Sequence, residues 1–194
     1  LNENLARETL ELHTLGVDGG YTQADVTSLS RIFTGWTFSH PQNDALYGGK
    51  FTFAFARHEP GDQKLLDKVF PEGGMEQGEA ALDFLASHPS TAKHIARKLV
   101  SHFVGDKAPP ALARKIEKVF LESNGDLAAV MQELIAANDA WAVDSRQMRS
   151  PVEFIVSADR LLSRPTKGKG LLAAAATMGH PIWNASSPKG FSDG

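Results

Sequence analysis

The 194-residue sequence contains no cysteine, which excludes disulfide bonds, thiolate metal sites and a cysteine nucleophile. This absence leaves the compartment open, because a chain without cysteine suits an oxidising or a reducing one. An excess of basic residues is also missing. The formal net charge is −3 with both signs interspersed, so we expect no nucleic-acid partner. No apolar run approaches the roughly 20 residues that a membrane-spanning helix needs.

The motifs of several enzyme classes are missing as well. There is no GxSxG nucleophile elbow and no HExxH zinc motif, and the glycine loops at 16–20 and 168–170 do not have the P-loop pattern. The segment DGGYTQADV, residues 18–26, lacks the alternating acidic ligands and the closing glutamate of a calcium loop. None of the seven histidines has a companion at a spacing that requires zinc.

What is present is a helical texture with enough apolar residues, 42%, for a sizeable core. We predict one mainly α domain over residues 1–194, a multi-helix bundle-like fold with a small antiparallel β-hairpin insertion around residues 36–70 and an irregular tail at 179–194. Proline, glycine and capping patterns set the helix ends. The predicted helices span residues 2–16, 23–34, 75–87, 89–104, 109–123, 127–138, 151–163 and 171–178, with a flexible joint at 167–170.

The predicted hairpin is rich in aromatic residues. Residues 36–38 and 51–55 alternate with period two, and proline, asparagine and glycine residues lie between them. Residues 64–70 fit a short strand or a turn of helix. The aromatic side chains fit either a carbohydrate or peptide groove or packing against the helices.

Five ordered sequence blocks resemble one bacterial family, the domain of unknown function 1800 (DUF1800). The blocks are NENLARETLELHTLGVDGGYTQADV, TGWTF, RHEPGDQK, HPSTAKHIARKLVSHFV and SPVEFIVSADRLL. The third block departs from the family, which usually has His-Asp where this chain has His58-Glu59. The resemblance implies the C-terminal portion of a longer exported, periplasmic protein, often encoded beside a sulfatase-like protein, and it implies no established activity.

Glu8 is the most informative residue of the first helix. At 100° per residue, Leu1, Leu5, Leu12 and Leu15 fall within a sector of about 80° that also contains Glu8. A carboxylate among leucines must be paired, or its pKa rises. Two interpretations follow: a buried ion pair that fixes the helix position, or a general acid, general base or metal ligand.

The helix predicted at 89–104 has a polar edge beside its apolar face. His88, Thr91, Lys98 and His102 lie along this edge, while His94 and Arg97 point away from it. If this helix packs beside the first, Glu8 or Glu11 would meet Lys98 or His102. A histidine at such an edge is either a hydrogen-bonded packing residue or a ligand.

Two functional hypotheses follow. The leading one is a non-catalytic binding or assembly domain of an exported bacterial protein, with a protein partner that the resemblance suggests is sulfatase-like. The alternative is a metal-assisted or acid-base hydrolase with its site between helix 2–16, the 56–64 loop and helix 89–104. A divalent metal is compatible with these residues, but we do not predict a cofactor. The candidate residues are Glu8, Glu11, His58 and His102 for catalysis, His58, Glu59 and His88 for metal, and Asn4, Arg7, Glu8, Thr91 and Lys98 for a polar network.

Overall fold

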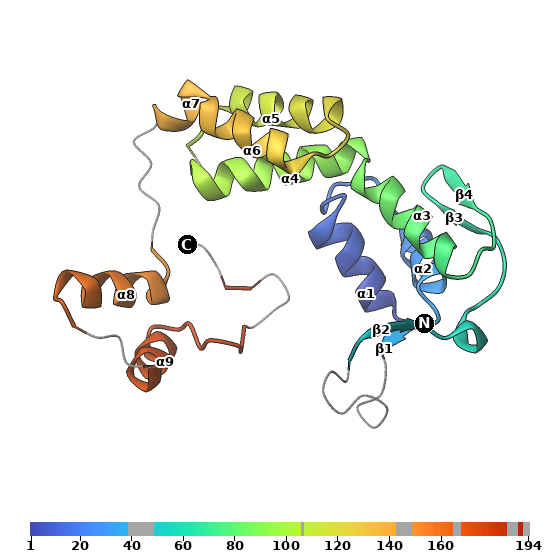
Figure 1. Cartoon of the computed structure of the whole chain (residues 1–194), viewed down its shortest axis with the longest axis horizontal. Helices are drawn as coiled ribbons and strands as arrows, with labels where there is room; N and C mark the ends of the chain where they lie inside the picture. Colours follow the sequence, from blue (N-terminus) through green and yellow to red (C-terminus); the bar gives the residue numbers. More distant parts are fainter. Residues whose placement is uncertain (39–48, 106, 143–148, 165–167, 186–189, 192–194) are drawn as a thin grey trace. The chain divides into compact units, whose positions relative to one another are not determined.

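The computed structural model describes residues 1–38, 49–105, 107–142, 149–164, 168–185 and 190–191 (Figure 1). Helices predominate, and the two sheets in the described residues are antiparallel pairs of short strands, which confirms the predicted mainly α class. The sequence predicted one domain, whereas the contacts divide the chain into two compact units, residues 1–143 and 144–194. In the described part of the chain, no helix is both long and apolar enough to cross a bilayer.

The regular α-helix of the N-terminal segment is shorter than predicted. Helix α1 spans Glu3–Glu8 and continues as a π-helical turn, η1, at Thr9–His13. Helix α2, Gln23–Ile32, begins with the predicted capping box, in which Thr22 accepts from the Asp25 amide and Asp25 accepts from the Thr22 amide. Such reciprocal capping satisfies amides that the first turn of a helix leaves unpaired.

Two hairpins follow α2, where we predicted one hairpin and a further short element. Strand β1, Trp36–Phe38, pairs with β2, Phe51–Phe53, and β3, Gln63–Leu65, pairs with β4, Lys68–Phe70. The predicted strand at 51–55 ends earlier, because a 3₁₀ turn, η3, occupies Phe55–Arg57. In both hairpins the strands are three residues long, so their stability must come from packing against helices.

The first hydrophobic core joins α1, α2, the β3–β4 hairpin and α3, Met75–Ala86. On α1 and η1 its buried members are Ala6 and Leu10, not the predicted leucine stripe. Leu1 and Leu5 are 68% and 47% exposed, so the predicted apolar face was wrong at its N-terminal end, whereas Leu15 of the same stripe is buried in this core. Leu5 lies in α1 before the π-helical turn, so its exposure reflects packing through Ala6; from residue 9 on, the turn also changes the angular advance per residue, and a projection at 100° no longer holds.

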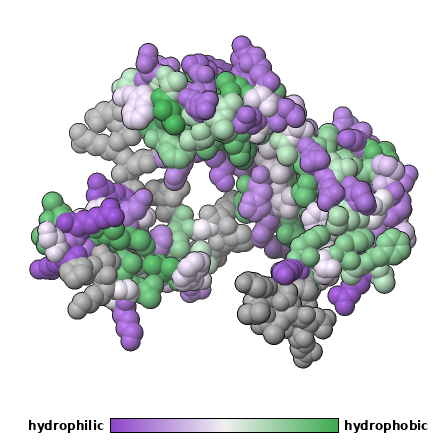
Figure 2. Space-filling model, in the orientation of Figure 1, coloured by the Kyte–Doolittle hydropathy of each residue, from purple (hydrophilic) through white to green (hydrophobic). Residues whose placement is uncertain are grey.

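The second hydrophobic core lies between three helices that pack side by side (Figure 1). These are α4, Pro89–Phe103, α5, Pro110–Glu122, and α6, Leu127–Ala136. A short helix that we did not predict, α7, follows at Asn138–Trp141. The visible surface of these helices mixes hydrophilic and hydrophobic residues (Figure 2).

In its described residues, the C-terminal unit contains two helices, α8, Pro151–Leu161, and α9, Gly168–Thr177. The predicted capping box at the start of α8 is confirmed by reciprocal bonds between Ser150 and Glu153. The predicted joint was wrong for residues 168–170, which form the first turn of α9, whereas residue 167 lies outside the described residues. Residues 179–185 form no regular element, as predicted for the tail.

Candidate functional site

Glu8 is not an unpaired carboxylate in the core. Its side chain is half-buried and accepts a hydrogen bond of 2.9 Å from Asn4 Nδ2, one turn earlier on α1. The two residues lie four positions apart, the spacing at which side chains meet on a helix surface. The predicted network around Glu8 therefore includes Asn4.

The other polar residues of α1 hold this helix against α2. Arg7 Nη2 donates to Gln23 Oε1 over 2.5 Å, and Gln23 in turn donates to Glu3. Burial raises the pKa of the Tyr21 hydroxyl, and the Glu11 carboxylate raises it further while Arg7 lowers it. Arg7 thus bonds to α2, and the charges of Arg7 and Glu11 influence Tyr21 in the loop before α2.

The candidate residues at the start of α4 have structural partners. His88 is the N-cap, and its Nδ1 accepts from the Ser90 amide over 3.1 Å. Thr91 is buried and donates to the Leu85 carbonyl over 2.7 Å. Both contacts satisfy groups at the junction of α3 and α4, where helix ends leave amides and carbonyls unpaired.

Lys98 and His102 lie further along α4 and are exposed. The His102 ring packs edge-on against Phe103, with centroids 4.8 Å apart. His94, which we predicted to point away from the polar edge, contacts η1, and its Nε2 lies 3.2 Å from the Leu12 carbonyl oxygen. The N-terminal segment therefore packs on the His94 side of α4.

His58 has an enclosed side chain. Its side chain is only 2% exposed, and its Nδ1 lies 2.9 Å from the Thr34 carbonyl oxygen. Because that carbonyl can only accept, Nδ1 carries the proton. Nε2 makes no hydrogen bond and faces the Glu72 carboxylate, with 3.4 Å between Nε2 and Oε1.

Glu72 is a member of this site that the sequence analysis missed. It accepts from the amides of Gly61 and Gly74, and the Gly61 bond is the main cause that lowers its pKa. Its own amide donates to Asp62 over 2.9 Å. No spacing rule connects residue 72 to residue 58, because the loop before β3 and the turn after β4 bring them together only in three dimensions.

Glu59 points to a different partner from its neighbour His58. Its carboxylate lies 3.4 Å from Arg31 Nε, and its amide donates to Thr34 Oγ1 over 2.7 Å. Together these contacts fasten the loop after η3 to the C-terminal end of α2. An acid-base pair such as His58 and Glu72 can transfer a proton, but a histidine side chain that is 2% exposed offers a substrate almost no access.

A metal site would require several of these groups to converge. Among the described residues, no three histidine, aspartate or glutamate side chains are grouped so that they could hold a metal ion. The predicted metal ligands have separate partners: His58 has Thr34 and Glu72, Glu59 has Arg31, and His88 caps α4. The described part of the chain therefore offers no preformed metal site.

The β1–β2 hairpin carries the aromatic residues outward. Trp36 lies opposite Phe53, and Phe38 opposite Phe51, so the four side chains share one face of the sheet, which we call the aromatic face. Trp36 and Phe53 are partly buried, whereas Phe38 and Phe51 are 64% and 56% exposed. The inner pair packs against the helices, as one of the two predicted roles requires, and the outer pair faces solvent; a groove for a carbohydrate or peptide stays a prediction.

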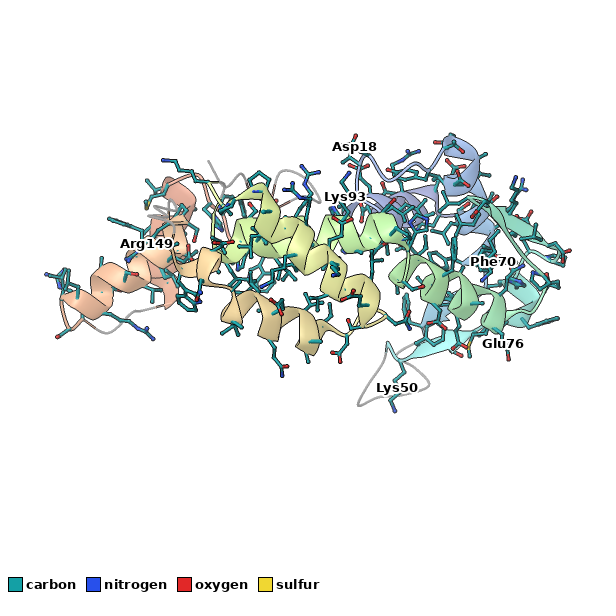
Figure 3. All side chains as sticks on the ribbon, turned by 90° about the horizontal axis from the view of Figure 1, so that it is seen from above. Asp18, Lys50, Phe70, Glu76, Lys93 and Arg149 are labelled. Atoms are coloured by element: carbon teal, nitrogen blue, oxygen red, sulfur yellow. The ribbon has the colours of Figure 1, made fainter. Side chains whose placement is uncertain are left out.

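Glycines make room for the inner pair. A Cβ atom on Gly78 of α3 would lie 2.5 Å from Trp36 Cζ2, and one on Gly35 would lie 2.8 Å from Phe53 Cε2. Trp36 also contacts Phe33 and Phe51, with ring centroids 5.2 Å away in each case. In Figure 3, Lys50 lies at the outer end of the hairpin, away from Phe70 in the core.

Comparison with known proteins identifies the family and nothing finer. The family described as "Protein of unknown function (DUF1800)" matches residues 1–194, and the chain belongs to that family. No curated protein matches the chain. No solved structure matches it either.

Proposed function

We propose that this DUF1800 chain is a non-catalytic binding domain and that the aromatic face of the β1–β2 hairpin is its contact surface. The observation that carries the proposal is the exposure of Phe38 and Phe51, directly opposite one another on adjacent strands. Exposed aromatic side chains supply large contact area with few rotatable bonds, and they are enriched in protein interfaces.

The occupant that this surface fits is an extended apolar segment of a protein partner. Among the described residues, β1 and β2 pair only with each other, so each has an outer edge without a neighbouring strand. A peptide that adds a third strand would pair its backbone with one edge and place alternate side chains beside the aromatic face.

The alternative hydrolase has weaker support. It needs a substrate to reach His58 or Glu8, but His58 is enclosed and Glu8 is engaged by Asn4. From the family resemblance we further propose that the protein is an exported bacterial protein and that its partner is sulfatase-like. That partner is the first individual protein to test once a peptide preference is known.

A displayed library of random peptides tests the binding function on the purified chain. Peptides are selected on the wild type, and their binding is then measured with Phe51→Ser and with Val69→Ser. The control suits the test because Val69, on the other hairpin, is 56% exposed, as is Phe51. We expect Phe51→Ser to weaken the selected peptides about tenfold or more, the loss typical of a hot-spot residue, and Val69→Ser to leave them unchanged.

Hydrogen exchange supplies the second measurement. A bound peptide should slow exchange of the amides in β1 or β2, because the added strand pairs with one of them. Failure to select any peptide, or equal loss with both variants, would refute the proposed contact surface. Protection confined to α4–α6 would also contradict it.

A further inference from the structure

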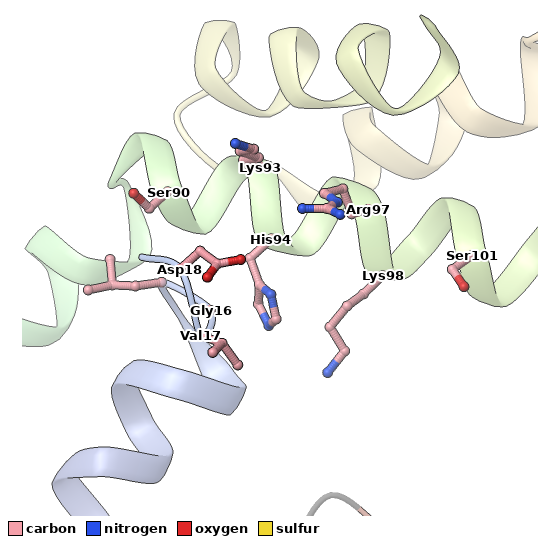
Figure 4. A pocket seen from close by; sticks show the side chains of 10 residues that line it. Gly16, Val17, Asp18, Ser90, Lys93, His94, Arg97, Lys98 and Ser101 are labelled. Atoms are coloured by element: carbon pink, nitrogen blue, oxygen red, sulfur yellow. The ribbon is translucent and has the colours of Figure 1, made fainter. Parts of the chain in front are cut away.

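A cationic hollow of about 350 Å³ lies where the loop after η1 meets α4 (Figure 4). The loop contributes Gly16, Val17 and Asp18, and α4 contributes Lys93, His94, Arg97 and Lys98. The lining therefore includes three cations and one carboxylate, on a chain whose net charge is −3. Asp18 and Lys93 lie at the same edge of the unit in the view of Figure 3.

The three cations have no ion-pair partner among the residues that the structure describes. Elsewhere in this unit, Lys115 pairs with Glu133, and Lys118 pairs with Glu122. Along α4, Lys93 and Arg97 are one turn apart, as are His94 and Lys98, so two adjacent rows of the helix surface carry these side chains. Like charges at this spacing repel one another and destabilise a helix slightly unless an anion lies between them.

The wall of the hollow is fixed by a specific contact. His94 Nε2 lies 3.2 Å from the Leu12 carbonyl oxygen, so Nε2 carries the proton and Nδ1 faces Gly16. A Cβ atom at residue 16, where φ is +85°, would lie 2.8 Å from His94 Nδ1. The glycine therefore lets the loop approach α4 closely, and the π-helical turn η1 presents the carbonyl that positions His94.

We propose that this hollow binds a small ligand through a phosphate or sulfate group. Its volume suits a small molecule, since ligand pockets begin near 300 Å³. The Arg97 guanidinium offers a fork of donors that matches tetrahedral oxyanions, and Lys93 and Lys98 add mobile point charges. Both faces of the hollow belong to the first unit and neither includes the aromatic face, so the site is independent of the proposed peptide surface.

Titration calorimetry on the purified chain tests the proposal with inorganic phosphate, sulfate, pyrophosphate and glucose 6-phosphate, each at constant ionic strength. Arg97→Gln is the test variant, and Arg114→Gln is the matched control, because it removes the same charge from the neighbouring helix α5 at a residue that does not line the hollow. We expect saturable binding of at least one anion, weakened about tenfold by Arg97→Gln and unchanged by Arg114→Gln. Tighter binding of glucose 6-phosphate than of phosphate would identify an organic ligand, and the reverse order a free anion.

Thermal unfolding gives an independent readout that does not depend on heat of binding. The anion that binds should raise the melting temperature of the wild type and of Arg114→Gln equally, and that of Arg97→Gln by less at the same anion concentration. The absence of saturable binding for all four probes would overturn the proposal. Equal weakening by both substitutions would overturn it as well, because it would show general charge attraction.

Discussion

The two hairpins of the N-terminal unit have the same strand length but opposite relations to the core. In β3–β4, Gln63, Leu65 and Phe70 are buried, and the hairpin is part of the first hydrophobic core. In β1–β2, only the inner half of the aromatic face packs against helices, and Phe38 and Phe51 remain exposed. The comparison shows that one hairpin anchors the fold, whereas the other uses a small anchor to present aromatic side chains.

The largest expected effect comes from truncating the anchoring hairpin. Phe70 is 1% exposed and packs edge-on against Phe84, with centroids 5.7 Å apart. Phe70→Ala should lower the free energy of unfolding by about 3–5 kcal/mol, because it removes buried area and leaves a cavity. Phe51→Ala, its counterpart on the other hairpin, should lower it by about 1 kcal/mol or less, the size of a cross-strand pair. Urea denaturation of both variants measures the difference, and equal losses would contradict the division of roles.

A smaller effect is expected where α2 holds the turn of the anchoring hairpin. Asp25 is 8% exposed; its Oδ2 accepts from Thr22, and its Oδ1 accepts from the Leu66 amide over 2.6 Å. Asp25→Asn removes one acceptor oxygen and should cost about 1–3 kcal/mol at pH 7. The matched control is Asp67→Asn, because Asp67 is exposed in the same turn.

The same carboxylate predicts a pH dependence with a definite sign. Burial opposes ionisation of Asp25, but the hydrogen bonds from Thr22 and Leu66 outweigh it, and the pKa lies below the ordinary 3.8. A lowered folded-state pKa stabilises the protein above the unfolded pKa, and this contribution is lost as the pH falls through the folded value. The difference in unfolding free energy between wild type and Asp25→Asn should therefore shrink below about pH 3.8. Denaturation curves at pH 7 and below pH 3.8 measure this, and a constant difference would argue against the assignment.

The anchor of the displayed hairpin can be perturbed separately. A Cβ atom on Gly78 would overlap the Trp36 ring, with 2.5 Å to Cζ2. Gly78→Ala should therefore displace Trp36 and cost about 1–2 kcal/mol, despite the better helix propensity of alanine. Gly73→Ala is the control, because its nearest contact would be an ordinary 3.6 Å. Increased quenching of tryptophan fluorescence in Gly78→Ala alone would confirm the anchor, whereas unchanged quenching would count against it.

Local patterns predicted the elements of the fold well and their packing less well. Capping boxes at Thr22 and Ser150 and proline at the starts of α4, α5 and α8 are read from a few adjacent residues, and these predictions are confirmed. The π-helical turn η1 has no comparable signal, because it depends on how the segment packs. The leucine stripe around Glu8 failed already in α1, where Ala6 is buried and Leu5 is exposed.

The candidate site was less accessible to sequence reasoning than the fold. His58 stands out in the sequence, but its partner Glu72 lies fourteen positions away, across the loop before β3 and the whole β3–β4 hairpin. The predicted set of catalytic and metal residues stays a prediction, and the structure shows only the separate neighbours of each. Contacts that depend on loop closure cannot be obtained from periodicity along a helix.

The smallest expected effect is at Glu8, the residue that the sequence made most prominent. Glu8 is half-buried and bonded to Asn4, so Glu8→Gln keeps an acceptor oxygen for that bond and should change the unfolding free energy by less than about 0.5 kcal/mol. A buried carboxylate that met Lys98 or His102 would instead cost several times more when neutralised, because its partner would be left unpaired. The control is Glu3→Gln, because Glu3 is on the same helix as Glu8 and accepts hydrogen bonds from Gln23 and Thr27 of α2. Denaturation of both variants separates the two cases. A loss at Glu8 that is much larger than at Glu3 and depends on pH would restore the buried ion pair and require α1 to approach α4 more closely than it does here.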